Sequence, residues 1–171
     1  MSECGGGHHH GKYRGRVVSN DDPLSLGRVQ ISCPALLGSG RQSWALPSLP
    51  YAGPGVGLFL VPPADADIWV EFEGGDLDRP IWTGCFWSSS DDVPADPAVA
   101  STKLLKTDGL TLTVDDTSGS GGVTLEVASP AVSQTVTIKL SSSGIELSTG
   151  SSNVKITSSS VSVNDGALEV M

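Results

Sequence analysis

Aliphatic side chains recur at every second position through the last third of the chain, from residue 107 to residue 171. Between these short aliphatic runs stand Ser, Thr, Gly, Asn and Asp, the residues that form tight turns. A period of two places the aliphatic side chains on one face of a β-strand and the polar ones on the other. The pattern therefore predicts a ladder of short strands that is apolar on one side only.

A single sheet cannot cover its own apolar face, and this stretch has no helical pattern and no aromatic residue to serve as a lid. The simplest partners are copies of the chain, wound around a shared axis with their aliphatic faces inward and their strands hydrogen-bonded across chains. We therefore predict an intertwined triple-stranded β-helix, or β-prism, formed in a homotrimer. The residues expected in its shared core are Leu110, Leu112, Val114, Val123, Leu125, Val127, Val136, Ile138, Leu140, Ile145, Leu147, Val154, Ile156, Val161 and Val163.

The aromatic residues divide the chain, because all nine lie between Tyr13 and Trp87. We expect four parts: a flexible N-terminal tail (1–10), an aromatic-containing domain (11–87), a linker (88–106) and the β-prism (107–171). Five short strands with long loops and no helical periodicity favour a small closed barrel such as an OB fold, in an all-β protein. The predicted barrel strands are Lys12–Ser19, Gly27–Cys33, Gly57–Val61, Ile68–Phe72 and Ile81–Phe86.

Composition argues against several classes of function. The net charge of −9 disfavours a nucleic-acid groove, and no apolar run reaches the length of a membrane span. Three cysteines without a CxxC pair disfavour a disulfide scaffold. Cys33 and Cys85 are expected to be buried thiols, since no histidine follows His10 to act as a base.

Several motifs in the aromatic-containing domain occur in the order of a known family. They are YRGRVV from Tyr13, DPLSLGRVQI from Asp22, LPYAGPGVG from Leu49, the pair Pro62-Pro63, and WVEFEGGDLDRPIWTG from Trp69. They resemble the OB-fold domain of phage baseplate central spike proteins. That family includes baseplate assembly protein V, the VgrG proteins of type VI secretion and the spikes of extracellular contractile injection systems. Residues 162–170 resemble the end of such spikes.

The resemblance implies a structural protein without catalytic residues or cofactors, the trimeric needle that pierces a target cell envelope. Its barrels would dock under a trimeric hub protein, and its prism would point at the target membrane. With Gly and His where a signal peptide has its apolar core, we expect synthesis in the cytoplasm and then assembly into a virion or injection particle. A histidine-held tip ion is not supported, and Leu168, Val170 and Met171 could instead form an end-plate for a PAAR-type tip protein.

Two polar clusters could bind ions or act on sugars. His8, His9 and His10 are weak metal-ligand candidates, and a flexible tail is the favoured alternative. Four carboxylates crowd one hairpin, where a solvated turn is favoured over glycoside hydrolysis or Ca²⁺ binding. These carboxylates belong to Glu71, Glu73, Asp76 and Asp78.

Two other features have both a functional and a structural interpretation. Trp44, Trp69, Trp82 and Trp87 could stack on sugars or bases, but core or interface packing is favoured. Residues 53–57 (GPGVG) lack the Lys-Ser/Thr of a phosphate loop and are expected to form a turn. The alternative functions left open are a β-rod adhesin and a carbohydrate-active tail protein.

Overall fold

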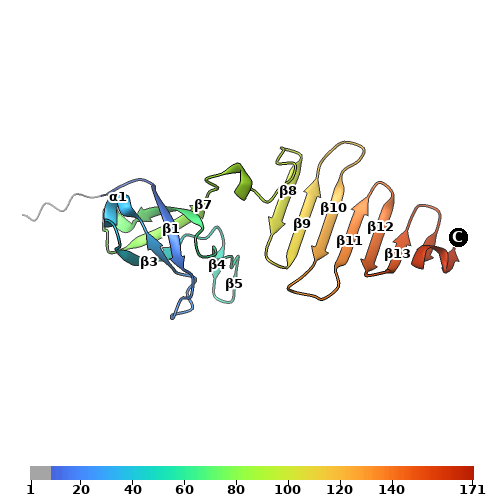
Figure 1. The fold of residues 1–171 in the computed structure, drawn as a ribbon, viewed down its shortest axis with the longest axis horizontal. Helices are drawn as coiled ribbons and strands as arrows, with labels where there is room; N and C mark the ends of the chain where they lie inside the picture. Colours follow the sequence, from blue (N-terminus) through green and yellow to red (C-terminus); the bar gives the residue numbers. More distant parts are fainter. Residues whose placement is uncertain (1–8) are drawn as a thin grey trace, which may run out of the picture. The chain divides into compact units, whose positions relative to one another are not determined.

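A computed structural model describes residues 9–171, and the chain divides into two compact units between Ser90 and Asp91. The N-terminal unit is built on a closed five-stranded barrel, and the C-terminal unit on one eight-stranded sheet (Figure 1). The prediction of an all-β protein with an N-terminal barrel is therefore confirmed. Within the described residues no helix has both the length and the apolar character needed to cross a membrane.

The barrel closes in the order β1-β2-β3-β7-β6, because β6 pairs back with β1. Neighbouring strands are antiparallel except β3 and β7, which run parallel. A short helix, α1, follows β2, and single 3-10 turns follow β6 (η1) and β7 (η2). The bounds are β1 (Tyr13–Ser19), β2 (Val29–Ser32), α1 (Pro34–Leu37), β3 (Gln42–Pro47), β6 (Asp67–Phe72), η1 (Glu73–Gly75), β7 (Pro80–Cys85) and η2 (Ser90–Asp92).

Inward-facing side chains from the barrel strands, with Cys33 and Leu37 beside them, form a hydrophobic core. Strand β6 illustrates the pattern, since every second residue from Ile68 to Phe72 is buried. Gly15 allows a close approach, because a Cβ there would lie 2.7 Å from Cγ2 of Val70. The buried side chains are Val17, Val29, Ile31, Cys33, Leu37, Ala45, Ile68, Val70, Phe72 and Trp82. The barrel therefore covers its own apolar surface.

The predicted third barrel strand, Gly57–Val61, is wrong. Its place is taken by β3, which pairs with β2 through Ala45 and with β7 through Leu46. Residues 52–57 instead form an isolated hairpin of β4 (Ala52–Gly53) and β5 (Val56–Gly57). The physical reason is burial, because Ala45 is fully buried in the barrel whereas Phe59 is 68% exposed.

The C-terminal sheet is an antiparallel meander in which each strand pairs with the next. Its first strand, β8, lies inside the segment predicted as linker, so the connection between the units is shorter than expected. One 3-10 turn, η3, separates the last two strands. The bounds are β8 (Thr102–Lys106), β9 (Leu110–Asp115), β10 (Gly122–Val127), β11 (Val136–Ser141), β12 (Gly144–Thr149), β13 (Ser152–Ile156), β14 (Val161–Val163), η3 (Asn164–Gly166) and β15 (Leu168–Val170).

The expectation that the sheet strands hydrogen-bond across chains is wrong for six of them. Strands β9 to β14 each pair on both edges with strands of the same chain. Pairing on both edges satisfies the backbone groups of these strands within the chain. Any association along these strands must therefore come from side chains.

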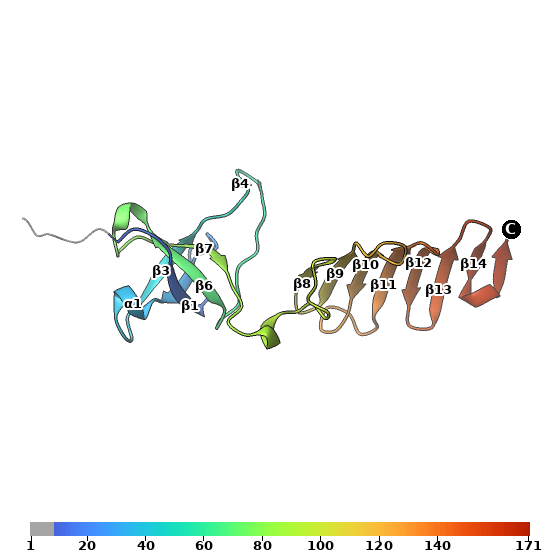
Figure 2. The ribbon, with the colours of Figure 1, turned by 90° about the horizontal axis from the view of Figure 1, so that it is seen from above.

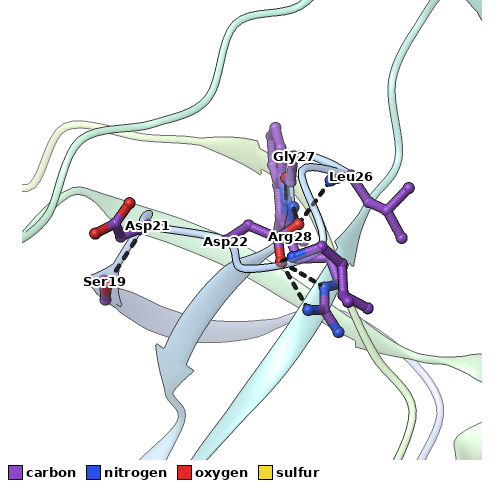
Figure 3. A network of polar contacts seen from close by, with 8 residues as sticks. Ser19, Asp21, Asp22, Leu26, Gly27 and Arg28 are labelled. Carbon is purple, nitrogen blue, oxygen red and sulfur yellow. Dashed lines mark hydrogen bonds and ion pairs between the residues drawn. The ribbon is translucent and has the colours of Figure 1, made fainter.

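The loop between β1 and β2 is organised by one carboxylate, that of Asp22 (Figure 3). It accepts hydrogen bonds from the backbone N–H groups of Leu24, Leu26 and Arg28, at 3.0, 2.8 and 3.2 Å. The Arg28 guanidinium donates two more, at 3.0 and 2.7 Å, and stacks 5.1 Å from the Trp44 ring. These contacts, with the Arg28 bond foremost, hold the pKa of the Asp22 carboxyl well below its usual range despite burial, which acts the other way.

Replacing Asp22 with Asn should lower the thermal unfolding midpoint of the barrel at pH 7. The side chain loses its negative charge, and its new NH₂ group faces the N–H donors that the carboxylate accepts from. Since the folded pKa is depressed, the stabilisation by Asp22 is complete above the ordinary aspartate pKa of about 3.9 and is lost as the pH falls below it. The difference in midpoint between the two proteins should therefore shrink in acid. Tryptophan fluorescence measures it, because all four tryptophans lie in the barrel unit.

Asp21→Asn is the matched control. The bond that Figure 3 draws for Asp21 runs from its backbone N–H to the Ser19 hydroxyl, at 3.3 Å, and the substitution keeps that N–H. It should leave the midpoint unchanged at every pH. A destabilisation by Asp22→Asn that is as large at pH 3 as at pH 7 would contradict the assigned role of the charge.

Candidate functional site

The register of the C-terminal sheet aligns its aliphatic side chains into three rows across one face, which we call the aliphatic face. The central row has one aliphatic residue from every strand. The side row begins at Lys103 and is aliphatic from β9 to β15, and the short row is aliphatic only from β9 to β11. The central row is Leu105, Leu112, Leu125, Ile138, Leu147, Val154, Val163 and Leu168; the side row is Val114, Val123, Leu140, Ile145, Ile156, Val161 and Val170; the short row is Leu110, Val127 and Val136.

All fifteen residues predicted for a shared core fall on this face, and the structure adds Leu105 from the strand that the sequence analysis placed in the linker. Sequence reasoning missed Leu105 because Leu104 stands beside it and breaks the alternation. The participation of these residues in a shared core remains a prediction, whereas their common face is a property of the single chain.

The aliphatic face is uncovered in the single chain. No described residue from 91 to 171 is buried, whereas six barrel side chains are large and fully buried. Leu140 and Leu147, on neighbouring strands in the middle of the sheet, are 44% and 43% exposed. An apolar patch that spans a whole sheet is larger than soluble monomers normally expose, and marks an interaction surface.

The face is hollowed over β11 to β14. A groove of about 410 Å³ lies there, and its aliphatic lining comes from four residues of the central row and from Val136 of the short row. Ile138 and Leu147 lie side by side in its wall, as do Val154 and Val163. Its chemistry suits aliphatic side chains and offers no cluster of groups for catalysis.

The opposite face of the same strands is polar. Lys155 lies 2.7 Å from Asp165 and 3.9 Å from Glu146, and Asn153 donates to the second Asp165 oxygen at 3.0 Å. The hydrogen bond with Asp165 is the main cause that raises the pKa of Lys155, and its counterpart lowers the pKa of Asp165. The sheet is thus two-sided, with paired charges facing away from the aliphatic face.

The residues predicted at the tip lie on the last strand and just beyond it. Leu168, Val170 and Met171 are 62%, 61% and 100% exposed. Strand β15 pairs only with β14 and is an edge of the sheet. The end of the sheet therefore offers an apolar surface together with an unpaired strand edge.

The other predicted site residues do not converge on a catalytic or metal centre in the part of the chain that the structure describes. His8 lies outside the described residues. The His9 backbone N–H donates to the Gly75 carbonyl at 3.2 Å, and the His10 carbonyl accepts from the Tyr13 hydroxyl at 3.1 Å. No group of three or more metal-ligating side chains occurs among residues 9–171.

Each of the four hairpin carboxylates lies near a cation. Glu71 is 2.9 Å from Lys12, and Asp78 is 2.9 Å from Arg41. Glu73 and Asp76 are both 3.8 Å from Arg79. This pairing on an exposed turn supports the structural interpretation over that of a carboxylate pair poised in a cleft.

The predicted packing of the tryptophans holds for Trp82 and Trp69, whereas Trp87 is 61% exposed. Trp82 is buried and donates from Nε1 to the Gly27 carbonyl at 3.2 Å, and Trp69 packs on Phe86 at 4.7 Å. Cys33 is buried, and desolvation raises the pKa of its thiol. The prediction that Cys85 is a buried thiol is wrong, because it lies exposed at the end of β7.

Comparison with known families assigns both units. Residues 13–87 match the family model of the type VI secretion system/phage-baseplate injector OB domain. Residues 102–169 match that of the phage baseplate V C-terminal trimerisation domain, and this match begins where β8 begins. No curated protein matches the chain. The trimerisation assignment falls on the unit whose aliphatic face is uncovered.

We expect Ile138→Asp to convert the trimer into monomers. Ile138 lies at the middle of the central row, between Leu125 and Leu147. Three carboxylates around one axis would stand in an apolar core without partners, at a cost of several kcal/mol each. Sedimentation equilibrium or native mass spectrometry gives the stoichiometry.

Lys139→Asp is the matched control, because Lys139 is the next residue on the same strand and faces the polar side. It should remain trimeric. Trimers of Ile138→Asp that melt like the unaltered protein would refute the packing of the aliphatic face at the axis.

Proposed function

Because this chain belongs to the phage baseplate V family and carries both its OB domain and its trimerisation domain, we propose that its homotrimer is the central spike of a contractile tail or injection particle. In this role the spike works mechanically and pierces the target cell envelope when the sheath contracts. The observation that carries the proposal is the eight-stranded sheet, in which none of the side chains that the structure describes is buried. Three copies of its aliphatic face would make one solid shaft.

The direction of the hydrogen bonds suits an axial load. In an antiparallel meander the backbone hydrogen bonds run perpendicular to the strands, along the direction in which the strands stack. Eight strands at about 4.8 Å spacing give a stack of about 34 Å. If this direction is the axis of the shaft, every strand is braced by its neighbours against compression.

The barrels and the tip are proposed to make the connections at either end. The barrel loops and the N-terminal tail would contact the trimeric hub protein, because the strands of the barrel are already closed around a buried core and leave the loops for other contacts. At the other end, Leu168, Val170 and Met171 would seat a PAAR-type tip protein, supported by their exposure and by the free edge of β15.

Shortening the shaft by one pair of strands tests the mechanical role. Deletion of residues 136–151 removes β11 and β12 and would bring β10 against β13, with Leu125 opposite Val154 and Val123 opposite Ile156. Removing two strands keeps the antiparallel order and the rows, so the trimer should persist with a shaft about 10 Å shorter. Particles that carry this spike should assemble and contract but deliver far less cargo or genome into cells.

Two further measurements on the shortened particles distinguish a piercing spike from an adhesin and from a carbohydrate-active protein. Cell adsorption and the degradation of surface polysaccharide should be unchanged in the shortened particles, and Lys139→Gln particles serve as the full-length control. Normal delivery by a shortened shaft would count against piercing. Lost adsorption would instead identify a receptor-binding rod, and lost polysaccharide cleavage would identify an enzyme.

A further inference from the structure

The N-terminal unit carries an apolar projection whose ends, Leu49 and Val61, pack against the barrel core, while the large apolar side chains between them are exposed. No charged residue occurs between Arg41 and Asp65, and within this stretch residues 49–61 include the β4–β5 hairpin. We call residues 49–61 the arm. Figure 2 shows the hairpin leaving the barrel. The large apolar side chains exposed on the arm are Tyr51 (61%), Val56 (53%), Leu58 (46%), Phe59 (68%) and Leu60 (47%).

The arm is held at its roots and shaped by its own hydrogen bonds. Before it, the Ser48 N–H donates to the Trp82 carbonyl at 2.9 Å; after it, the Asn20 side chain donates to the Pro62 carbonyl at 3.2 Å. Between these roots the Leu58 N–H donates to the Tyr51 carbonyl at 2.9 Å, and Gly55 turns the hairpin with a φ of +73°. A preformed projection loses less conformational entropy on binding than a loose loop.

The same barrel has a shallow apolar hollow, which we call the cradle. Its volume is about 310 Å³, and its apolar lining comes from Leu26, Trp44, Leu46 and Ile81. Leu26 and Leu46 are 56% and 48% exposed. Four charged side chains, those of Arg28, Glu73, Asp78 and Arg79, also border the hollow. An apolar floor with a polar border is the usual composition of a protein–protein contact.

The three-fold symmetry of the trimer indicates which group would occupy the cradle. In a closed three-fold ring every contact is heterologous, so each subunit must present two different and complementary patches. The arm and the cradle are two such patches on one barrel. Only residues 86–101 separate the last barrel strand from β8, so the trimerised sheets would hold the three barrels at an effective concentration on the order of millimolar.

We propose that each arm packs into the cradle of the neighbouring barrel and closes the three barrels into a ring. Without such cover the free trimer would expose three apolar arms, which a soluble protein avoids. Arm packing stabilises the barrel ring independently of the aliphatic face. The inference rests on the homotrimer but not on piercing, and its tests use the free spike.

Hydrogen exchange on the full-length trimer gives the first test. The amides of residues 52–60 should be protected in the unaltered protein and exchange much faster in Val56→Glu. Val99→Glu is the control, because Val99 is 50% exposed but lies outside the arm. Both variants should remain trimers, since the sheets still associate. Arms that exchange freely in the unaltered trimer, or that become protected only when the hub protein is added, would overturn the proposal.

Cross-linking gives the second test and identifies which barrel is contacted. In a Cys4→Ser, Cys85→Ser background, Tyr51→Cys combined with Leu26→Cys should form covalent trimers on mild oxidation. Tyr51→Cys combined with Val99→Cys should not. An intrachain disulfide alone in the first variant would mean that the arm folds back on its own barrel, and would overturn the proposal. Loss of the trimer in the reduced background protein would instead count against the sheet assembly.

Discussion

The structure depends on an aliphatic face that its own chain cannot cover. The C-terminal unit forms a regular sheet with complete strand pairing along β9 to β14, yet none of its described side chains is buried. The barrel solves the same problem by closing on itself around fully buried residues such as Val17, Ile31 and Ile68. One chain thus contains a barrel with a buried core of its own and a sheet without one, and the sheet is the unit that matches a trimerisation domain.

Strand pairing and oligomerisation use different groups in this sheet. Backbone hydrogen bonds join strands within one chain, whereas the aliphatic rows are left for contacts between chains. In the proposed shaft, the number of strands would set the length, and the width of the rows would set the cross-section. Each added pair of strands preserves both the register and the inward direction of the rows. Such a shaft can change in length without a change in how its chains meet.

Period-two alternation was a sufficient signal for most of the sheet. It placed fifteen aliphatic residues on one face, because regular strands with tight turns leave little freedom of register. It failed at β8, where Leu104 and Leu105 are adjacent and the pattern is ambiguous. It could also have placed Cys85 correctly, because Trp82 points inward and a residue three positions later on the strand points outward.

The barrel was harder to predict because its strands are chosen by tertiary contacts. Residues 57–61 are more apolar than Gln42–Pro47, yet only the latter pair with β2 and β7. The Asp22 network had no signal in periodicity, since five donors converge on one carboxylate through a loop rather than along a strand. Family motifs included Asp22 and Arg28, but only the structure explains why both are needed.

Charge placement supports the division between the two faces of the sheet. Residues 91–171 contain ten carboxylates and four lysines, a net charge of −6, so three parallel copies repel one another. Of the residues in the three rows only Lys103 is charged; it stands at the β8 end of the side row and is paired with Asp116. In the proposed trimer, the outward charges of different chains would lie a full shaft width apart. Salt would screen the repulsion between them, because the Debye length is only about 8–10 Å. In the proposed trimer the repulsion would be confined to the screened exterior, so that hydrophobic burial at the axis would decide the assembly.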